Sequence, residues 1–446
     1  MTLELERNID FAEARVRATL AQARRVAESE FTFPDGPAAL DLIINKLQGH
    51  LDEVGSLRAE GIQDKKIIFA ECHKALEGVS NVLPILGVIL RSTHIRNAFE
   101  VYGPIRQVAK VLIGPEGSTK APPRLIWSSG WDYVPMTFRR IKYLPGFVII
   151  TIPASESANP LILPLAGHEL GHRVWTDEKI EDICNEPLAT AIAQFVKTNY
   201  QESYLTIPGG AEAEVENVRR YLLDNARQIP KFDAAILNGS RQAEELFCDL
   251  LGYFLFGESF LNAFSYLMSP RPPQDRRPAY PKMSTRAALL ESASGRFNTD
   301  IANVYTKPDS FVDLFFDDER HVDFWTKATD AAAMAIGAIL IEKMIELSSR
   351  ANWKDLPQLS VEKRVTIRTE SYAWGVPASD AGSLGNILNA AWDAVLDKDF
   401  WSNFHPLLVQ QEKDRRQFRE TALREIVLKS IEVFEYEFIL RTHGAK

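Results

Sequence analysis

Residues 167–175 read GHELGHRVW and combine two histidines, four positions apart, with a glutamate directly after the first. On an α-helix, positions i and i+4 lie about 40° apart around the axis, so the imidazoles of His168 and His172 can bind the same ion. Glu169 can then reach a water molecule beside that ion and act as a general base. The spacing therefore predicts a zinc site that performs hydrolysis, with His168 and His172 as metal ligands and Glu169 as the catalytic base.

A catalytic zinc ion needs a third protein ligand and keeps one position open for water or substrate. A histidine six residues past the second one is excluded, because positions 175 and 178 are Trp175 and Glu178. The sequence RQAEELFCDLLGYFLF offers Glu245 instead, followed one helical turn later by Asp249. We expect Glu245 to bind the metal and Asp249 to accept the ring N–H of a liganding histidine, which would fix the orientation of that ring.

The HELGH motif at 168–172 and the ExxxD motif at 245–249 resemble those of the gluzincin class of zinc metallopeptidases. The resemblance implies a zincin-like catalytic core with one Zn²⁺ ion, peptide-bond hydrolysis, and the ligands and base named above. It also implies that Asp249 supports His168 and that the small Gly171 lets the second helix approach. The two motifs are farther apart than in compact members of the class, so we expect a helical hairpin or lid inserted between them.

Other residues could take part in the same chemistry. Either Glu244 or Glu258 could replace the predicted third ligand. Tyr280 and His321 are candidates for stabilising the developing oxyanion, a role that gluzincins give to tyrosine or histidine. Arg286 could bind a carboxylate of the substrate. These roles depend on the tertiary fold, because the residues lie on separate segments of the chain.

Cysteine usage and hydrophobic patterning indicate the compartment. The three cysteines, Cys72, Cys184 and Cys248, are odd in number and widely spaced, which excludes a disulfide framework and fits a reducing environment. The start of the chain lacks the apolar stretch of a secretory signal, and the longest apolar runs are shorter than the roughly 18 residues of a membrane span. We therefore expect a cytoplasmic protein without a membrane-spanning segment, with Cys248 packed in its core.

Apolar residues recur at helical spacing through most of the chain. Three short segments near 124–129, 131–138 and 146–153 interrupt them and are predicted to be strands, and the last is rich in β-branched residues. If the last of these were an edge strand, an extended peptide could add to it. The predicted fold class is mainly α with a small β-sheet (α+β), in which a zincin-like catalytic core is embedded in helical flanking regions. The predicted regions are a helical N-terminal region (1–114), the core (120–290) and a helical C-terminal region (291–446).

The sequence thus predicts a zinc-dependent metallopeptidase that acts on a peptide or protein substrate. The net charge of −9 over 446 residues argues against nucleic acid as a partner, because nucleic-acid binders carry basic surfaces. The long helical flanks suit a protein partner, so an alternative is a zincin-like regulatory or scaffold protein, weakly active or activated by that partner. A deformylase-like hydrolase would need a cysteine ligand upstream of the histidines, and Cys72 is distant and lies in a helical pattern.

Overall fold

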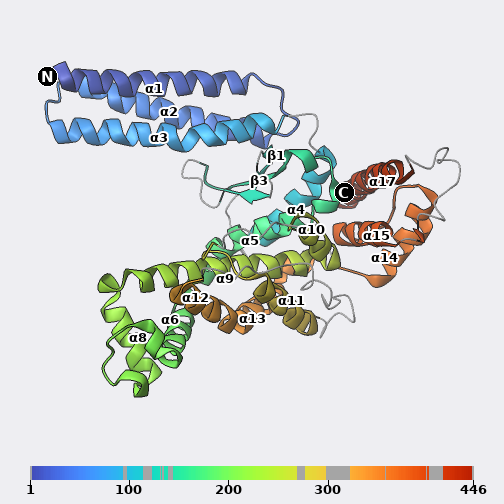
Figure 1. Ribbon diagram of the computed structural model, residues 1–446. Coiled ribbons are helices and arrows are strands. Elements are labelled where there is room, and N and C mark those ends of the chain that lie inside the picture. The colour runs from blue at the N-terminus through green and yellow to red at the C-terminus, as the bar shows by residue number, and fades with distance from the viewer. Residues whose placement is uncertain are drawn as a thin grey trace. The chain divides into compact units, whose positions relative to one another are not determined.

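The structure is a computed structural model (Figure 1) that describes residues 3–93, 98–113, 123–130, 132, 135–138, 144–268, 277–297, 322–356, 358–397, 399–400 and 415–443. The chain divides into two compact units. The first comprises Met1–Tyr102 and Thr119–Ala158, and the second comprises Gly103–Ser118 and Asn159–Lys446. These boundaries differ from the three predicted regions, because residues 119–158 belong with the N-terminal helices and the two motifs share one unit with the C-terminal helices.

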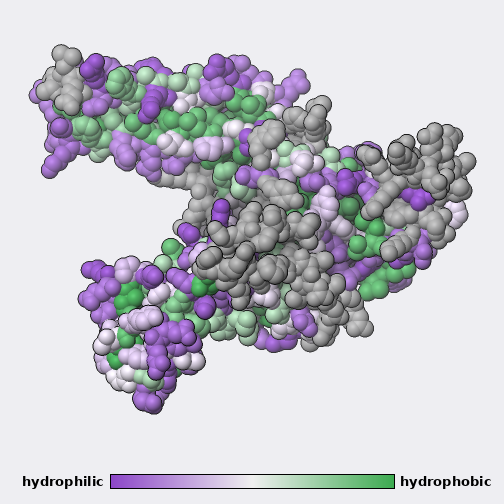
Figure 2. Space-filling view, in the orientation of Figure 1, coloured by the Kyte–Doolittle hydropathy of each residue, from purple (hydrophilic) through white to green (hydrophobic). Residues whose placement is uncertain are grey.

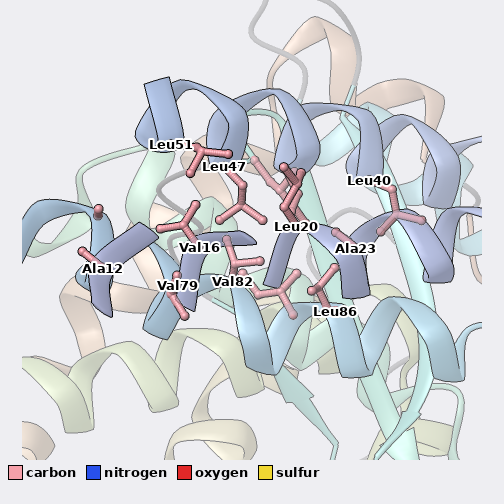
Figure 3. Packing of buried hydrophobic residues seen from close by; sticks show 14 of the residues in the cluster. Ala12, Val16, Leu20, Ala23, Leu40, Leu47, Leu51, Val79, Val82 and Leu86 are labelled. Carbon is pink, nitrogen blue, oxygen red and sulfur yellow. The ribbon is translucent and has the colours of Figure 1, made fainter. Parts of the chain in front are cut away.

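Three long helices form most of the first unit: α1 (Leu3–Ala27), α2 (Asp35–Ala59) and α3 (Lys65–Arg91). They pack pairwise along their lengths. Their apolar residues at helical spacing meet in one core, where Val16, Leu20, Leu47 and Val82 point toward one another (Figure 3). Figure 2 shows hydrophilic residues along the margins of this bundle with hydrophobic ones between them. Amphipathic periodicity therefore accounts for the bundle, since each apolar stripe is buried by its two neighbours.

A three-stranded sheet packs on α2 and α3 within the same unit. Strands β1 (Arg124–Gly130) and β3 (Phe147–Pro153) are parallel, and the short β2 (Met136–Thr137) pairs with β3 on its other side. Side chains anchor β1 to the helices, for example through the Ser128 hydroxyl, which donates to the Val88 carbonyl at 2.7 Å. The strand order is β1-β3-β2. The idea that β3 is an edge strand open to a peptide is therefore wrong, because β3 is the central strand.

Helix α9 (Pro230–Phe256) organises the second unit and contacts seven of its helices. These seven are α5 (Leu165–Asp177), α6 (Ile180–Thr198), α10 (Glu258–Met268), α11 (Met283–Phe297), α12 (Phe324–Ala335), α13 (Gly337–Ser348) and α15 (Leu384–Leu396). The unit also contains α4 (Tyr102–Ile113), α7 (Tyr200–Ser203), α8 (Val215–Asp224), α14 (Val361–Thr366) and α17 (Arg415–His443). Figure 1 shows α9 as the long helix running through this unit. Neighbouring helices enclose the second half of α9, in which every residue from Gln242 to Tyr253 is buried, including polar ones that need partners.

Proline and glycine set the ends of the helices that matter most for the motifs. A single 3₁₀ turn at Pro160–Ile162 precedes α5, and Pro164 occupies the N-cap position of α5. Helix α9 ends at Gly257, whose φ of +58° favours glycine and whose N–H donates back to the Tyr253 carbonyl at 2.8 Å.

The fold agrees with the predicted class, because the described residues are mostly helical with one small sheet. Helices α6, α7 and α8 lie between the HELGH and ExxxD motifs, so the segment that separates them is largely helical. Among the described residues, no helix is both long and apolar enough to span a membrane.

Candidate metal centre

Helix α5 crosses α9 at a very short distance, and two glycines make this possible. A Cβ atom built on Gly171 would lie 2.8 Å from the Cα of Cys248, and one built on Gly167 would lie 2.9 Å from the Cα of Gly252. Carbon atoms normally approach no closer than about 3.5 Å. The expected role of Gly171 is therefore confirmed: only a residue without a side chain lets the two helices meet at this level.

The crossing places the HELGH motif against the acidic face of α9. His168 is largely buried, Glu169 and His172 are buried, and the two imidazole rings lie 5.1 Å apart with an interplanar angle of 85°. From α9, the carboxylates of Glu244, Glu245 and Asp249 are all buried. A group of three acids is expensive to bury without partners, and the two histidines are such partners.

Each histidine contacts its own carboxylate through Nδ1. His168 Nδ1 lies 2.9 Å from Asp249 Oδ1, and His172 Nδ1 lies 2.9 Å from Glu244 Oε1. An ionised carboxylate can only accept, so the hydrogen in each pair belongs to the imidazole nitrogen. The Nε2 atom of each ring therefore points away from these two carboxylates. The prediction that Asp249 supports His168 is in agreement with this contact, and Glu244 takes the same part at His172 rather than replacing Glu245.

Glu245 lies on the Nε2 side of both rings. Its Oε2 is 3.3 Å from His168 Nε2, and its Oε1 is 3.9 Å from His172 Nε2. Two ligand atoms bound to one tetrahedral zinc ion at about 2.0–2.2 Å are themselves about 3.3 Å apart. The Glu245 carboxylate therefore lies at about this separation from His168 Nε2, and its other oxygen lies somewhat farther from His172 Nε2. These side chains come from helices whose motifs are 73 positions apart.

The charges of this cluster shift its pKa values. Burial alone would lower the pKa of His168, but its contacts with Asp249 and Glu245 outweigh burial and raise the pKa to about 10. Burial would raise the pKa of Glu245, but His168, His172 and Arg286 lower it to about 2. Without a metal, a proton thus holds the His168 Nε2–Glu245 contact together, and a metal ion at this position would displace it.

Cys248 offers a second possible donor set. Its Sγ and one nitrogen from each of His168 and His172 lie within 4.8 Å of one another. The thiol, however, is 3.4 Å from His172 Nδ1, the nitrogen that already contacts Glu244. Burial raises the pKa of the Cys248 thiol well above its ordinary value, and the surrounding acids, including Glu169, raise it further. A protonated thiol on the Nδ1 side of the ring is a poorer third ligand than the Glu245 carboxylate on the Nε2 side.

Arg286 occupies a different place from the one expected. Its guanidinium is buried, with an exposed fraction of 5% for the residue, and it contacts Asp249 and Glu245. The idea that Arg286 binds a carboxylate of the substrate is therefore wrong in this structure, because its partners are carboxylates of the protein itself. Glu258 is also excluded as a third ligand, because it forms an ion pair with Arg364 away from the histidines.

The structure describes only one of the two predicted oxyanion donors. Tyr280 is 48% exposed and belongs to the short segment before α11, where the Pro278 carbonyl accepts a hydrogen bond from Gln242 Nε2 at 2.7 Å. Since Gln242 lies one turn before Glu245 on α9, this segment runs beside the cluster. His321 lies outside the described residues. The roles of Tyr280 and His321 stay predictions.

Sequence reasoning missed the pairing of Glu244 with His172 and the pairing of Arg286 with Asp249. The local signal for Glu244 was its position next to Glu245, which had suggested only that it could replace the predicted third ligand. Arg286 was expected to bind a carboxylate, but nothing in the local sequence identified Asp249 as its partner. No known protein family matches the chain, and neither a curated protein nor a solved structure matches it.

Proposed function

We propose that this protein is a zinc-dependent metallopeptidase of the gluzincin type that acts in the cytoplasm. His168, His172 and Glu245 would hold the ion, and Glu169 would act as the general base. The observation that carries the proposal is the position of the Glu245 carboxylate, 3.3 Å and 3.9 Å from the Nε2 atoms of the two histidines. The carboxylates on both Nδ1 atoms add support, because liganding histidines usually donate their second N–H to such a partner.

When bound, zinc supplies a Lewis acid that polarises a carbonyl group and lowers the pKa of water toward about 7. The remaining chemistry belongs to residues of the chain. Glu169 follows His168 directly on α5 and is buried, so its carboxylate can take the proton of the attacking water and pass it to the leaving amine. Asp249 and Glu244 keep the two rings in the tautomer that leaves Nε2 free to bind the ion.

The choice of a peptide bond rests on the resemblance of the two motifs to gluzincins, since strand addition at β3 no longer supports it. A second candidate is a regulatory or scaffold protein on the same frame. It is favoured by the separately packed bundle of α1, α2 and α3, which has its own core and exposes large apolar side chains such as Phe11 at 64% and Leu83 at 49%. Such a unit suits a protein partner.

The test compares Glu169→Gln with the wild type. We expect the purified wild type to contain close to one zinc ion and to cleave an unstructured fluorescent protein substrate. Glu169→Gln should keep the metal and lose hydrolysis, because an amide cannot accept the proton. Glu186→Gln on the neighbouring helix α6, where the side chain is 78% exposed, is a matched control that should behave as the wild type.

Two further variants assign the ligands. We expect His172→Ala and Glu245→Ala to lose zinc while keeping the helical circular dichroism of the wild type. A wild type that fails to bind zinc after reconstitution would overturn the metal centre. If the wild type binds zinc but, like Glu169→Gln, cleaves no substrate, the scaffold function would be favoured instead. Undiminished hydrolysis in Glu169→Gln would refute the proposed role of this residue.

A further inference from the structure

We propose that Arg286 is a positioning residue of the metal centre: its guanidinium fixes the carboxylates of Asp249 and Glu245 and thereby makes helix α11 part of the site. This inference rests on the proposed function, because it concerns the same ligands. It adds a third helix to a centre that the two motifs alone would build from α5 and α9. It also assigns a role to a buried charge that the hydrolytic chemistry does not use.

The contacts of Arg286 have the geometry of a two-pronged clamp. Its Nε donates to Asp249 Oδ2 at 2.6 Å, and its Nη2 donates to Asp249 Oδ1 at 3.1 Å. The same Nη2 lies 3.5 Å from Glu245 Oε2. Asp249 is thus held by two parallel N–H donors, an arrangement that specifies the plane of the carboxylate as well as its position. Oδ1 of this fixed carboxylate contacts His168 Nδ1 at 2.9 Å.

The guanidinium also contacts an aromatic ring. It lies over the ring of Phe264 on α10, with 4.8 Å between its central carbon and the ring centroid. Helix α11, which carries Arg286, packs on α9, α12 and α13. The orientation of Asp249 and Glu245 therefore depends on the docking of α11, because Arg286 reaches the two acids only from that helix.

The benefit of Arg286 to metal binding must come from orientation rather than from charge. A positive charge close to a ligand repels a divalent cation, and in a buried site this repulsion is only weakly screened. An arginine that supplied charge alone would weaken the centre. A lysine carries the same charge but a single ammonium group, so it cannot hold a carboxylate in two parallel contacts. Substitution by lysine thus removes the clamp and keeps the charge.

The experiment measures zinc affinity of the full chain by competition with a chromophoric chelator, and the visible spectrum of the protein loaded with Co²⁺. We expect Arg286→Lys to raise the zinc dissociation constant about 10–100-fold, the range found when partners of metal ligands are removed. The Co²⁺ spectrum should change, since the ligands are less well fixed. Arg296→Lys is the matched control: it lies on the same helix, pairs with Glu342 at 2.6 Å on the surface, and should leave both measurements unchanged.

Melting temperatures of the metal-free proteins separate a positioning role from a merely structural one. If Arg286→Lys melts at a lower temperature but keeps the zinc affinity and the Co²⁺ spectrum of the wild type, the inference is overturned and the proposed function is left intact. A wild type that binds no zinc would overturn both. If Arg286→Lys fails to fold, Arg286→Gln replaces it, and this variant removes both the fork and the positive charge. Because loss of the charge alone should strengthen zinc binding, weaker binding in Arg286→Gln would support the clamp, and unchanged or stronger binding would contradict it.

Discussion

The crossing of α5 and α9 gives the sharpest prediction, because a single methyl group should disrupt it. Replacing Gly171 by alanine places a Cβ atom 2.8 Å from the Cα of Cys248 and 3.0 Å from its Sγ. The first of these is a backbone atom, which no rotation of a side chain can move. Since carbon contacts are normally about 3.5–4.0 Å, the two helices would have to separate locally by about 1 Å.

A separation of this size should disrupt the contacts of the metal ligands but should destabilise the folded protein only moderately. The contact between His172 and Glu244 is 2.9 Å long, so a shift of about 1 Å would carry it beyond hydrogen-bonding distance. A metal site tolerates misplacement of its ligands by only about 0.5 Å. Overpacking of this kind costs about 1–3 kcal/mol, and alanine returns up to about 1 kcal/mol of helix propensity. We therefore expect Gly171→Ala to remain folded and to lose zinc affinity at least about tenfold.

The assay measures zinc affinity by chelator competition and thermal unfolding by circular dichroism. Gly295→Ala is the control, because it makes the same substitution in a helix of the same unit where an added Cβ meets nothing within 4 Å. It should bind zinc as the wild type does and melt at the same temperature or slightly higher. Wild-type zinc affinity in Gly171→Ala would refute the reasoning, since it would mean that the ligands do not depend on this crossing.

Two other predictions concern the titration and the identity of the ligands. Because the pKa of His168 is raised from 6.5 to about 10 in the folded metal-free protein, its contribution to stability is complete below pH 6.5 and is lost as the pH rises toward 10. As the pH rises through this range, the melting temperature of the chelator-treated protein should fall and its zinc affinity should rise. His168→Gln should weaken the dependence of the melting temperature on pH. The same dependence in this variant as in the wild type would contradict the role of His168. Cys248→Ala should keep zinc affinity, and the Co²⁺-loaded wild type should lack a thiolate charge-transfer band. A band that disappears in Cys248→Ala would make Cys248 the third ligand in place of Glu245.

Local periodicity explains why much of the fold could be predicted. Helix α6 and strand β3 follow from apolar spacing and β-branched composition within each segment. The apolar pattern from Phe324 to Leu347 also predicts helix, but the structure divides it into α12 and α13. The pairings of His168 with His172 and of Glu245 with Asp249 follow in the same way, because residues four apart share one helix face whatever surrounds the helix. Gly171 could also be predicted, since a small residue on that face permits a close neighbour.

Contacts between distant segments could not be predicted, because no local period encodes them. The sequence by itself determined that α5 carries an imidazole pair and α9 a carboxylate pair. Only the tertiary structure decided that Glu244 meets His172, that Arg286 turns toward Asp249 and Glu245, and that β3 is the central strand. The physical reason is that these contacts depend on the angle and depth at which separate elements pack. Two glycines set that depth for α5 and α9, and the packing of α11 sets it for Arg286.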